Sequence, residues 1–434
     1  MAGLGASLFA QDLQFPGATP GATLPGAPVN VTLQNALERA RVYSQQVYSA
    51  DFAARIAHED TVQAKAALLP SVNELSQFIY TQPNGTPSGI FVSNDGPHVY
   101  NQQALIHGDI YNPVKLADYR RATAAEAVAR ARADLAARGL VATVVQNYYG
   151  LVVAQRKLVN AQRTLTEAQR FLDITQQLQR GGEAARSDVV KAQIQAEQRQ
   201  RDVADAQLAG EKARLALGVL LFPNYGQPFT VTDDVETPVP LPAYPEIQSM
   251  AARNSPDIRA AQAVVQQQTY EKVSARAALL PALSVDYFFG LNANQFAIHN
   301  PDGANLVGSA VAAQLTIPVW TWGAARSKIK QADLRLQQAR NDLSFTQRSL
   351  LSELDSFYLE ARAAFAQIAS LKLSMDLSAD SLRLTLLRYQ AGEVTVLEVV
   401  DAQSTLAQAR NAYEDGLLRY RLAVGSLQTL TGAF

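Results

Sequence analysis

Two stretches decide the fold: GGEAARSDVVKAQ at 181–193 and AGEVTVLEVVDAQ at 391–403. They align without a gap at an offset of about 210 residues. A second pair, AKAALLP at 64–70 and ARAALLP at 275–281, lies at almost the same offset. Self-similarity at one fixed spacing is the signature of a repeated structural unit. The sequence therefore predicts a chain that is duplicated end to end.

The duplication divides the chain into three parts. Residues 1–30 begin with a short apolar run, MAGLGASLFAQ, and continue as a Pro/Gly-rich linker. We interpret this part as a signal-peptide remnant that lacks the usual basic start, with an unstructured terminus as the alternative. Residues 31–230 are predicted to form the first structural repeat and residues 231–434 the second.

Each repeat contains a long tract without proline, from Pro113 to Pro223 and after Pro318. Both tracts are rich in Ala, Leu, Gln, Arg and Glu, which favour helices. Apolar residues recur every seven positions, as helices packed side by side require. These positions include Leu151, Leu158, Leu165 and Leu172 in the first repeat and Leu336, Leu343 and Leu350 in the second. A helix over 114–180 would be roughly 100 Å long.

Each tract is broken once, at Gly181–Gly182 and at Ala391–Gly392. Gly182 and Gly392 suit a turn that requires positive φ. Each repeat should therefore contain a long helical hairpin with this turn at its tip.

Extended segments precede each hairpin, after helical segments at 32–68 and 245–279. In the second of these helical segments Ser255 is a good N-cap, with Pro256 at the first helical position. We predict strands at about 71–82, 99–111, 283–292 and 308–317, separated by polar loops rich in Gly, Pro and Asn. Alternating segments of this length are typical of transmembrane strands, but a small soluble sheet capping a coiled coil has the same pattern.

Four strands cannot close a barrel, and an open edge cannot lie in lipid. A membrane interpretation therefore requires three copies that share twelve strands. Trp320 and Trp322 follow the last strand, where either a membrane interface or packing at a junction suits them.

Several classes of function are excluded by what the sequence lacks. Charges balance at 38 basic and 39 acidic residues, so nucleic acid is not an expected partner. Cysteine is absent, which excludes disulfides, thiolate metal sites and a cysteine nucleophile. No apolar run reaches the roughly 18 residues of a transmembrane helix. Nucleotide-binding and hydrolase motifs are missing and the four histidines are scattered, so we expect no enzyme, no cofactor and no metal site.

The order of elements, together with YQAGEVTVLEVVDAQSTLAQARNAY at 389–413, resembles the TolC-type outer-membrane efflux protein family over residues 32–430. The resemblance implies a mainly α fold with a small β part. In it, long helical hairpins form an α-helical barrel, and four strands per chain contribute to a twelve-stranded transmembrane β-barrel in a homotrimer.

The same resemblance implies a location and a role. The protein would lie in outer-membrane lipid and extend into the periplasm. It would act as the exit duct of a tripartite efflux or type I secretion system, a passive conduit gated at its periplasmic tip. Its partners would be a periplasmic adaptor (membrane fusion) protein and an inner-membrane pump or exporter. The alternative is a soluble periplasmic coiled-coil scaffold or adaptor, although adaptors normally carry one such hairpin.

Particular residues match the family's tip. The resemblance implies a pore gate at Glu398 and Asp401 and a latch between Asp188 and Tyr389. Val394 stands where the family has a latch arginine, so this part of the match fails. A solvated helix face remains the alternative for the acidic residues.

The resemblance also implies a docking surface for the adaptor at the two hairpin tips. In this sequence the matching residues are Gly181, Gly182, Gly392 and Thr395.

Overall fold

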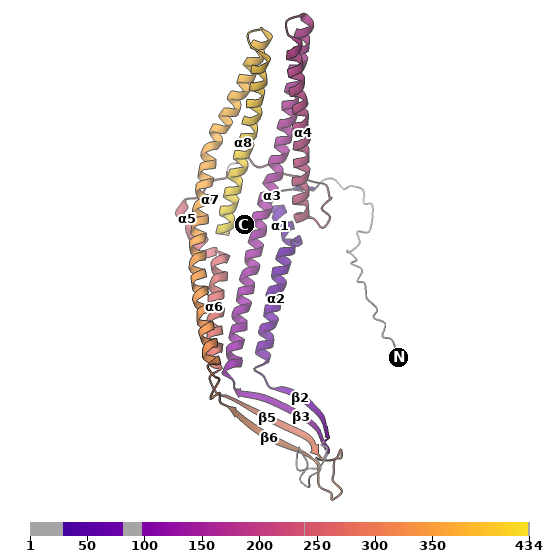
Figure 1. Cartoon of the computed structure of the whole chain (residues 1–434), viewed down its shortest axis with the longest axis vertical. Coiled ribbons are helices and arrows are strands. Elements are labelled where there is room, and N and C mark those ends of the chain that lie inside the picture. The colour runs from indigo at the N-terminus through magenta and orange to yellow at the C-terminus, as the bar shows by residue number, and fades with distance from the viewer. Residues whose placement is uncertain (1–28, 81–97, 238, 433–434) are drawn as a thin grey trace, which may run out of the picture.

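The computed structural model describes residues 29–80, 98–237 and 239–432. The molecule is elongated, with a four-stranded sheet at one end and two helical turns at the other (Figure 1). Long helices connect these ends, so the predicted fold class, mainly α with a small β part, is confirmed. The predicted loop between the first two strands lies at 81–97, outside the described residues.

Each repeat begins with a pair of helices that meet at a serine. These are α1 (Leu33–Tyr43) and α2 (Gln45–Ala66), and α5 (Tyr244–Asn254) and α6 (Pro256–Ala277). The hydroxyls of Ser44 and Ser255 accept hydrogen bonds of 3.3 Å from the N–H groups of Val47 and Ile258. A serine in this role starts a new helix. The predicted N-cap at Ser255 is therefore confirmed, whereas the break at Ser44 inside the predicted helical segment 32–68 was not predicted.

The long hairpins consist of α3 (Pro113–Gly181) with α4 (Arg186–Leu221), and α7 (Ala324–Gln390) with α8 (Val396–Thr431). The heptad positions are buried or half-buried, as the spacing predicted. Side by side, the helices of the sheet-proximal half follow the order α2, α3, α6, α7 (Figure 1). None of the helices in the described ranges combines the length and the hydropathy needed to cross a lipid bilayer.

The four-stranded sheet is antiparallel, in the order β2–β3–β5–β6. Its members are β2 (Ser71–Tyr80), β3 (His98–Tyr111), β5 (Ala282–Ala293) and β6 (Val307–Thr316). The register places polar side chains such as Gln77, Asn101 and Asn292 on one face. The opposite face carries exposed apolar side chains, among them Phe78, Phe289, Val311 and Leu315.

A second, two-stranded sheet lies at mid-height and was not predicted. Its parallel strands β1 (Val29–Val31) and β4 (Phe229–Val231) are about 200 residues apart in sequence. Their apolar side chains join the largest buried cluster, which includes Tyr148, Leu151 and Leu217 from the long helices. This core attaches the start of each repeat to the first hairpin.

Candidate functional site

The two hairpin tips have the same backbone turn. Gly182 has φ 81° and Gly392 has φ 76°, both in the left-handed region. In each turn the glycine N–H donates to the carbonyl three residues before it, at 3.0 Å. The next N–H donates five residues back, at 2.9 Å. A Cβ at either glycine would meet no atom within 4 Å. Glycine is therefore required by the backbone conformation and not by lack of space.

The predicted gate residues lie just beyond the second tip. Thr395 is the N-cap residue of α8. The Glu398 carboxylate accepts hydrogen bonds from the Thr395 N–H at 3.3 Å and from the Thr395 hydroxyl at 3.4 Å. This reciprocal arrangement is a capping box, which holds the Glu398 side chain at the helix start. Glu398 and Asp401 both line a groove of about 570 Å³ between α7 and α8, opposite Ser374 and Ser378. The two carboxylates therefore share one face, as their spacing predicted.

The predicted latch residues are not hydrogen bonded to one another in the described part of the chain. Tyr389 is buried against Phe171, with ring centroids 5.2 Å apart, and its hydroxyl has no hydrogen-bond partner among the described residues. Asp188 lies in the first turn of α4, where Lys191 approaches its carboxylate at 3.8 Å. Gly181 is the last residue of α3. The predicted latch between Tyr389 and Asp188 is therefore not formed in this structure.

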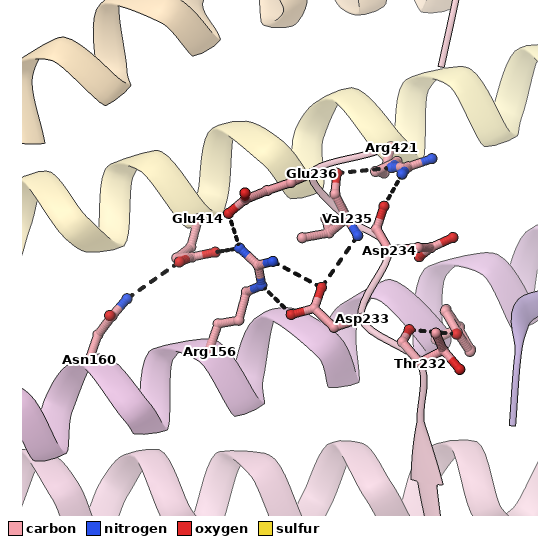
Figure 2. Close-up of polar contacts among 10 residues, drawn as sticks. Arg156, Asn160, Thr232, Asp233, Asp234, Val235, Glu236, Glu414 and Arg421 are labelled. Carbon is pink, nitrogen blue, oxygen red and sulfur yellow. Dashed lines mark hydrogen bonds and ion pairs between the residues drawn. The ribbon is translucent and has the colours of Figure 1, made fainter. Parts of the chain in front are cut away.

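A polar cluster joins the two repeats at mid-height, and the sequence did not reveal it. Arg156 on α3 reaches the segment 222–237 that follows α4, which we call the inter-repeat linker (Figure 2). Its guanidinium binds Asp233 in bidentate fashion at 2.6 and 3.0 Å and Glu236 at 2.6 Å. It also approaches Glu414 on α8 at 3.5 Å. One cation therefore connects the first hairpin, the linker and the second hairpin.

The electrostatics of this cluster are unbalanced, because three carboxylates share one guanidinium. The Glu414 side chain is only 9% exposed. Burial raises the pKa of Glu414, and the Arg156 guanidinium opposes this effect. Burial by itself would lower the pKa of Arg156, but hydrogen bonds to Asp233 and Glu236 raise it overall. The cluster therefore depends on Arg156 staying in place.

A second arginine fixes the backbone of the inter-repeat linker. Arg421 on α8 is buried and donates to the carbonyls of Asp234, Val235 and Thr237, the last two at 3.1 and 2.9 Å. Its guanidinium lies 5.2 Å from the ring of Tyr149. Burial raises the pKa of Tyr149 to about 12. These charge-assisted bonds to backbone carbonyls hold the linker against α8.

Comparison with known proteins places the chain among channels. It is 22% identical to the outer membrane protein TolC of Vibrio cholerae, over 93% of each chain. It is 20% identical to the alkaline protease secretion protein AprF of Pseudomonas aeruginosa, over 85% of this chain and 77% of that one. The solved structure of the outer-membrane channel OprN superposes with a TM-score of 0.83 at 18% identity, covering 93% of this chain and 90% of that chain.

The duplicated hairpins and the small sheet are thus the fold of an outer-membrane channel subunit. The sequence profile described as outer membrane efflux protein matches residues 36–221 and 247–433, and the chain belongs to that family. The protein is located in the bacterial outer membrane and extends into the periplasm. This location decides against the soluble scaffold. Members of the family are passive channels and not enzymes.

Proposed function

We propose that three copies of this chain close into a ring that serves as the exit duct of a tripartite efflux or type I secretion system. The ring forms a passive conduit from the periplasm to the exterior, and its periplasmic tip is the gate. A relative whose name specifies secretion of an alkaline protease supports a role in export. The two structural repeats, 31–230 and 231–434, then form adjacent segments of the channel wall.

This proposal rests on one observation: the sheet and the row of helices above it both end on the same two sides of the protomer. Among the described elements, β2 and β6 are the ends of the sheet, and α2 and α7 are the ends of the helix row above it. Both flanks expose large apolar side chains, including Phe52 and Ile56 on α2 and Leu334 and Phe345 on α7. Apolar area of this extent is normally covered by a partner surface.

Closure by three copies satisfies both layers at once. The free edge of β6 in one copy meets the free edge of β2 in the next, which gives twelve strands without an exposed edge. The same rotation brings α7 of one copy against α2 of the next. A two-copy ring would have eight strands and too narrow a bore for an open duct.

The gate is assigned to Glu398 and Asp401. Three copies of each, brought together at the tips, concentrate negative charge around a narrow opening and favour cations there. The capping box supports this assignment because it fixes the Glu398 carboxylate at the helix start. In the closed state, the hydroxyl of Tyr389 donates to Asp188 and holds the two hairpins together. The buried, unpartnered hydroxyl described above supports such a second state.

The tips are the docking surface for a periplasmic adaptor, which in turn connects to an inner-membrane pump or exporter. Gly181, Gly182, Gly392 and Thr395 form the two turns, whose surroundings are open in the protomer. Helix ends of this kind present unpaired backbone groups to a partner. Two equivalent turns per copy offer six similar docking points in the ring.

Mass measurement and conductance test the proposed function together. The protein extracted from outer membranes in mild detergent should have the mass of a trimer and conduct ions in a planar bilayer. A stable monomer with intact strand content would refute the ring. A trimer that never conducts would refute the duct.

A further inference from the structure

The free edges of the sheet are bare along almost their whole length. Every residue of β2 except Ile79, and every residue of β6 except Val307, is exposed, whereas β3 and β5 are mostly half-buried or buried. A bare strand edge is a template for pairing with another chain. In the proposed ring this other chain is a second copy of the protein. The internal repeat predicts which residues of β6 and β2 pair between the two copies.

Within one chain the two repeats meet where β3 pairs with β5, which we call the internal seam. It serves as a template for the seam between two copies, where β6 of one copy pairs with β2 of the next. In the internal seam β3 pairs with β5, and His107 lies opposite Asp286. Ser71 and Ala282 are equivalent, because each directly follows the proline of the repeated ALLP motif. Ser71 lies opposite His107 in the first hairpin, and Ala282 lies opposite Thr316 in the second. His107 and Thr316 are therefore equivalent.

The partner of Thr316 follows from the same equivalence. Asp286 lies four residues after Ala282, so its counterpart in the first repeat lies four residues after Ser71, at Leu75. If the seam between copies repeats the internal seam, Thr316 of one copy lies opposite Leu75 of the next. Strand direction agrees, since β6 and β2 run oppositely within the sheet.

The connection between β6 and α7 is longer than its counterpart in the first repeat. Seven residues separate these elements, whereas Asn112 alone separates β3 from α3. This connection carries Trp320 and Trp322, whose rings pack edge to face at 5.8 Å and are 73% and 89% exposed. Trp322 has φ 52°, a conformation that is unusual for a bulky side chain and is found where the surroundings require it.

The internal seam shows what such a connection contacts. There Tyr111, at the end of β3, lines a groove of about 680 Å³ together with Leu280, and Ala277 beside it is buried. Counted on from the equivalence of His107 and Thr316, Tyr111 corresponds to Trp320, and the repeat offset of 211 residues relates Leu280 to Leu69. Leu69 is 68% exposed and Leu280 is 47% exposed, a difference that fits a covering side chain supplied by another copy at Leu69.

We infer that β6 of one copy pairs with β2 of the next with Thr316 opposite Leu75, and that Trp320 and Trp322 cover the neighbour's turn at 68–70. The inference rests on the proposed ring of three and adds its register and its principal apolar contact. The second repeat carries the larger aromatic side chains because this seam joins separate copies, whereas the internal seam is already joined by the chain.

Cysteine cross-linking tests the register, since the chain has no native cysteine. Leu75→Cys combined with Thr316→Cys should give a covalent trimer on oxidation, seen after denaturation without reductant. Leu75→Cys with Ala312→Cys is the matched control, displaced by four residues, about 13 Å. This distance exceeds what a disulfide spans. Cross-linking by the control pair alone would overturn the register. A native trimer in which neither pair cross-links would overturn it too, while a native monomer would overturn the ring as well.

Fluorescence tests the aromatic contact, because the chain contains only two tryptophans. Covered by the neighbour, the pair should be insensitive to brominated phospholipid in reconstituted trimers. Leu69→Ala should shift the emission to longer wavelength. Strong quenching by the brominated acyl chains would place the pair in lipid and overturn this contact.

Discussion

Replacing Arg156 with glutamine removes the cation that three carboxylates share, and the structure gives the size of the effect. Glu414 is nearly buried, and breaking a buried ion pair costs about 3 kcal/mol. Asp233 and Glu236 are about half exposed, so each of their pairs contributes less than about 1 kcal/mol. A loss of about 3 kcal/mol corresponds to about a hundredfold change in a local opening equilibrium.

Hydrogen exchange of the inter-repeat linker measures this opening directly. Amides at 232–237 should exchange about a hundredfold faster in Arg156→Gln than in the wild type. Lys157→Gln is the matched control, because Lys157 pairs with Asp415 at 2.6 Å on the surface. A surface pair contributes less than about 1 kcal/mol, so the control should change exchange less than about fivefold. Equal exchange in the two variants would refute the role assigned to Arg156.

The pH dependence adds a second check. Because burial raises the pKa of Glu414, the closed linker binds more protons than the open one, and its stability falls as the pH rises. Removal of Arg156 raises this pKa further. The deficit of Arg156→Gln should therefore be largest above neutral pH and shrink as the pH falls. Adding Glu414→Gln should abolish this pH dependence, and its persistence would identify another titrating group.

Three further predictions concern the tips. Gly392→Ala forces a side chain into the left-handed region, at about 1–2 kcal/mol, and should lower both thermal stability and export. Gly139→Ala, at an exposed helical position of α3 away from the tips, should lower neither. Glu398→Gln with Asp401→Asn preserves the capping box but removes the charge. Planar-bilayer recordings should then show weaker cation selectivity, and unchanged selectivity would assign these acids to a solvated face. Tyr389→Phe removes a hydroxyl that has no partner among the described residues, so stability should hold while conductance rises; unchanged conductance contradicts the latch.

The sequence predicted the repeat and the long hairpins better than the positions at which helices break and are capped. Repetition, missing proline and seven-residue spacing are strong signals over tracts of 60 residues or more, and they yielded the hairpins and both tips. The N-cap at Ser255 could be predicted because Pro256 follows it, whereas the break at Ser44 was missed because one capping residue is a weak local signal inside a helical pattern. The Thr395–Glu398 capping box carries a readable motif, but the acid was interpreted only as a gate residue.

The mid-height junction could not be predicted, for a different reason. β1 and β4 are three residues each, and their pairing depends on packing against the first hairpin and not on β propensity. Arg156 and Glu414 look like solvent-facing residues of a polar helix until the linker is seen to cross between them. The acidic residues Asp233, Asp234 and Glu236 were the available signal, although nothing in the sequence specifies their partner.

The mid-height junction lies far from the hairpin tips, so a small change of tilt at the junction produces a larger displacement at the tips. Between Arg156 and the turn at Gly182, α3 extends for roughly 40 Å, packed against α4 and α8. A tilt of about 5° at the junction would carry the turn sideways by about 3 Å over an arm of this length. Three arms tilting in concert would change the opening by a multiple of that step. A tilt too small to disturb the buried core at mid-height can therefore change the width of the opening at the hairpin tips.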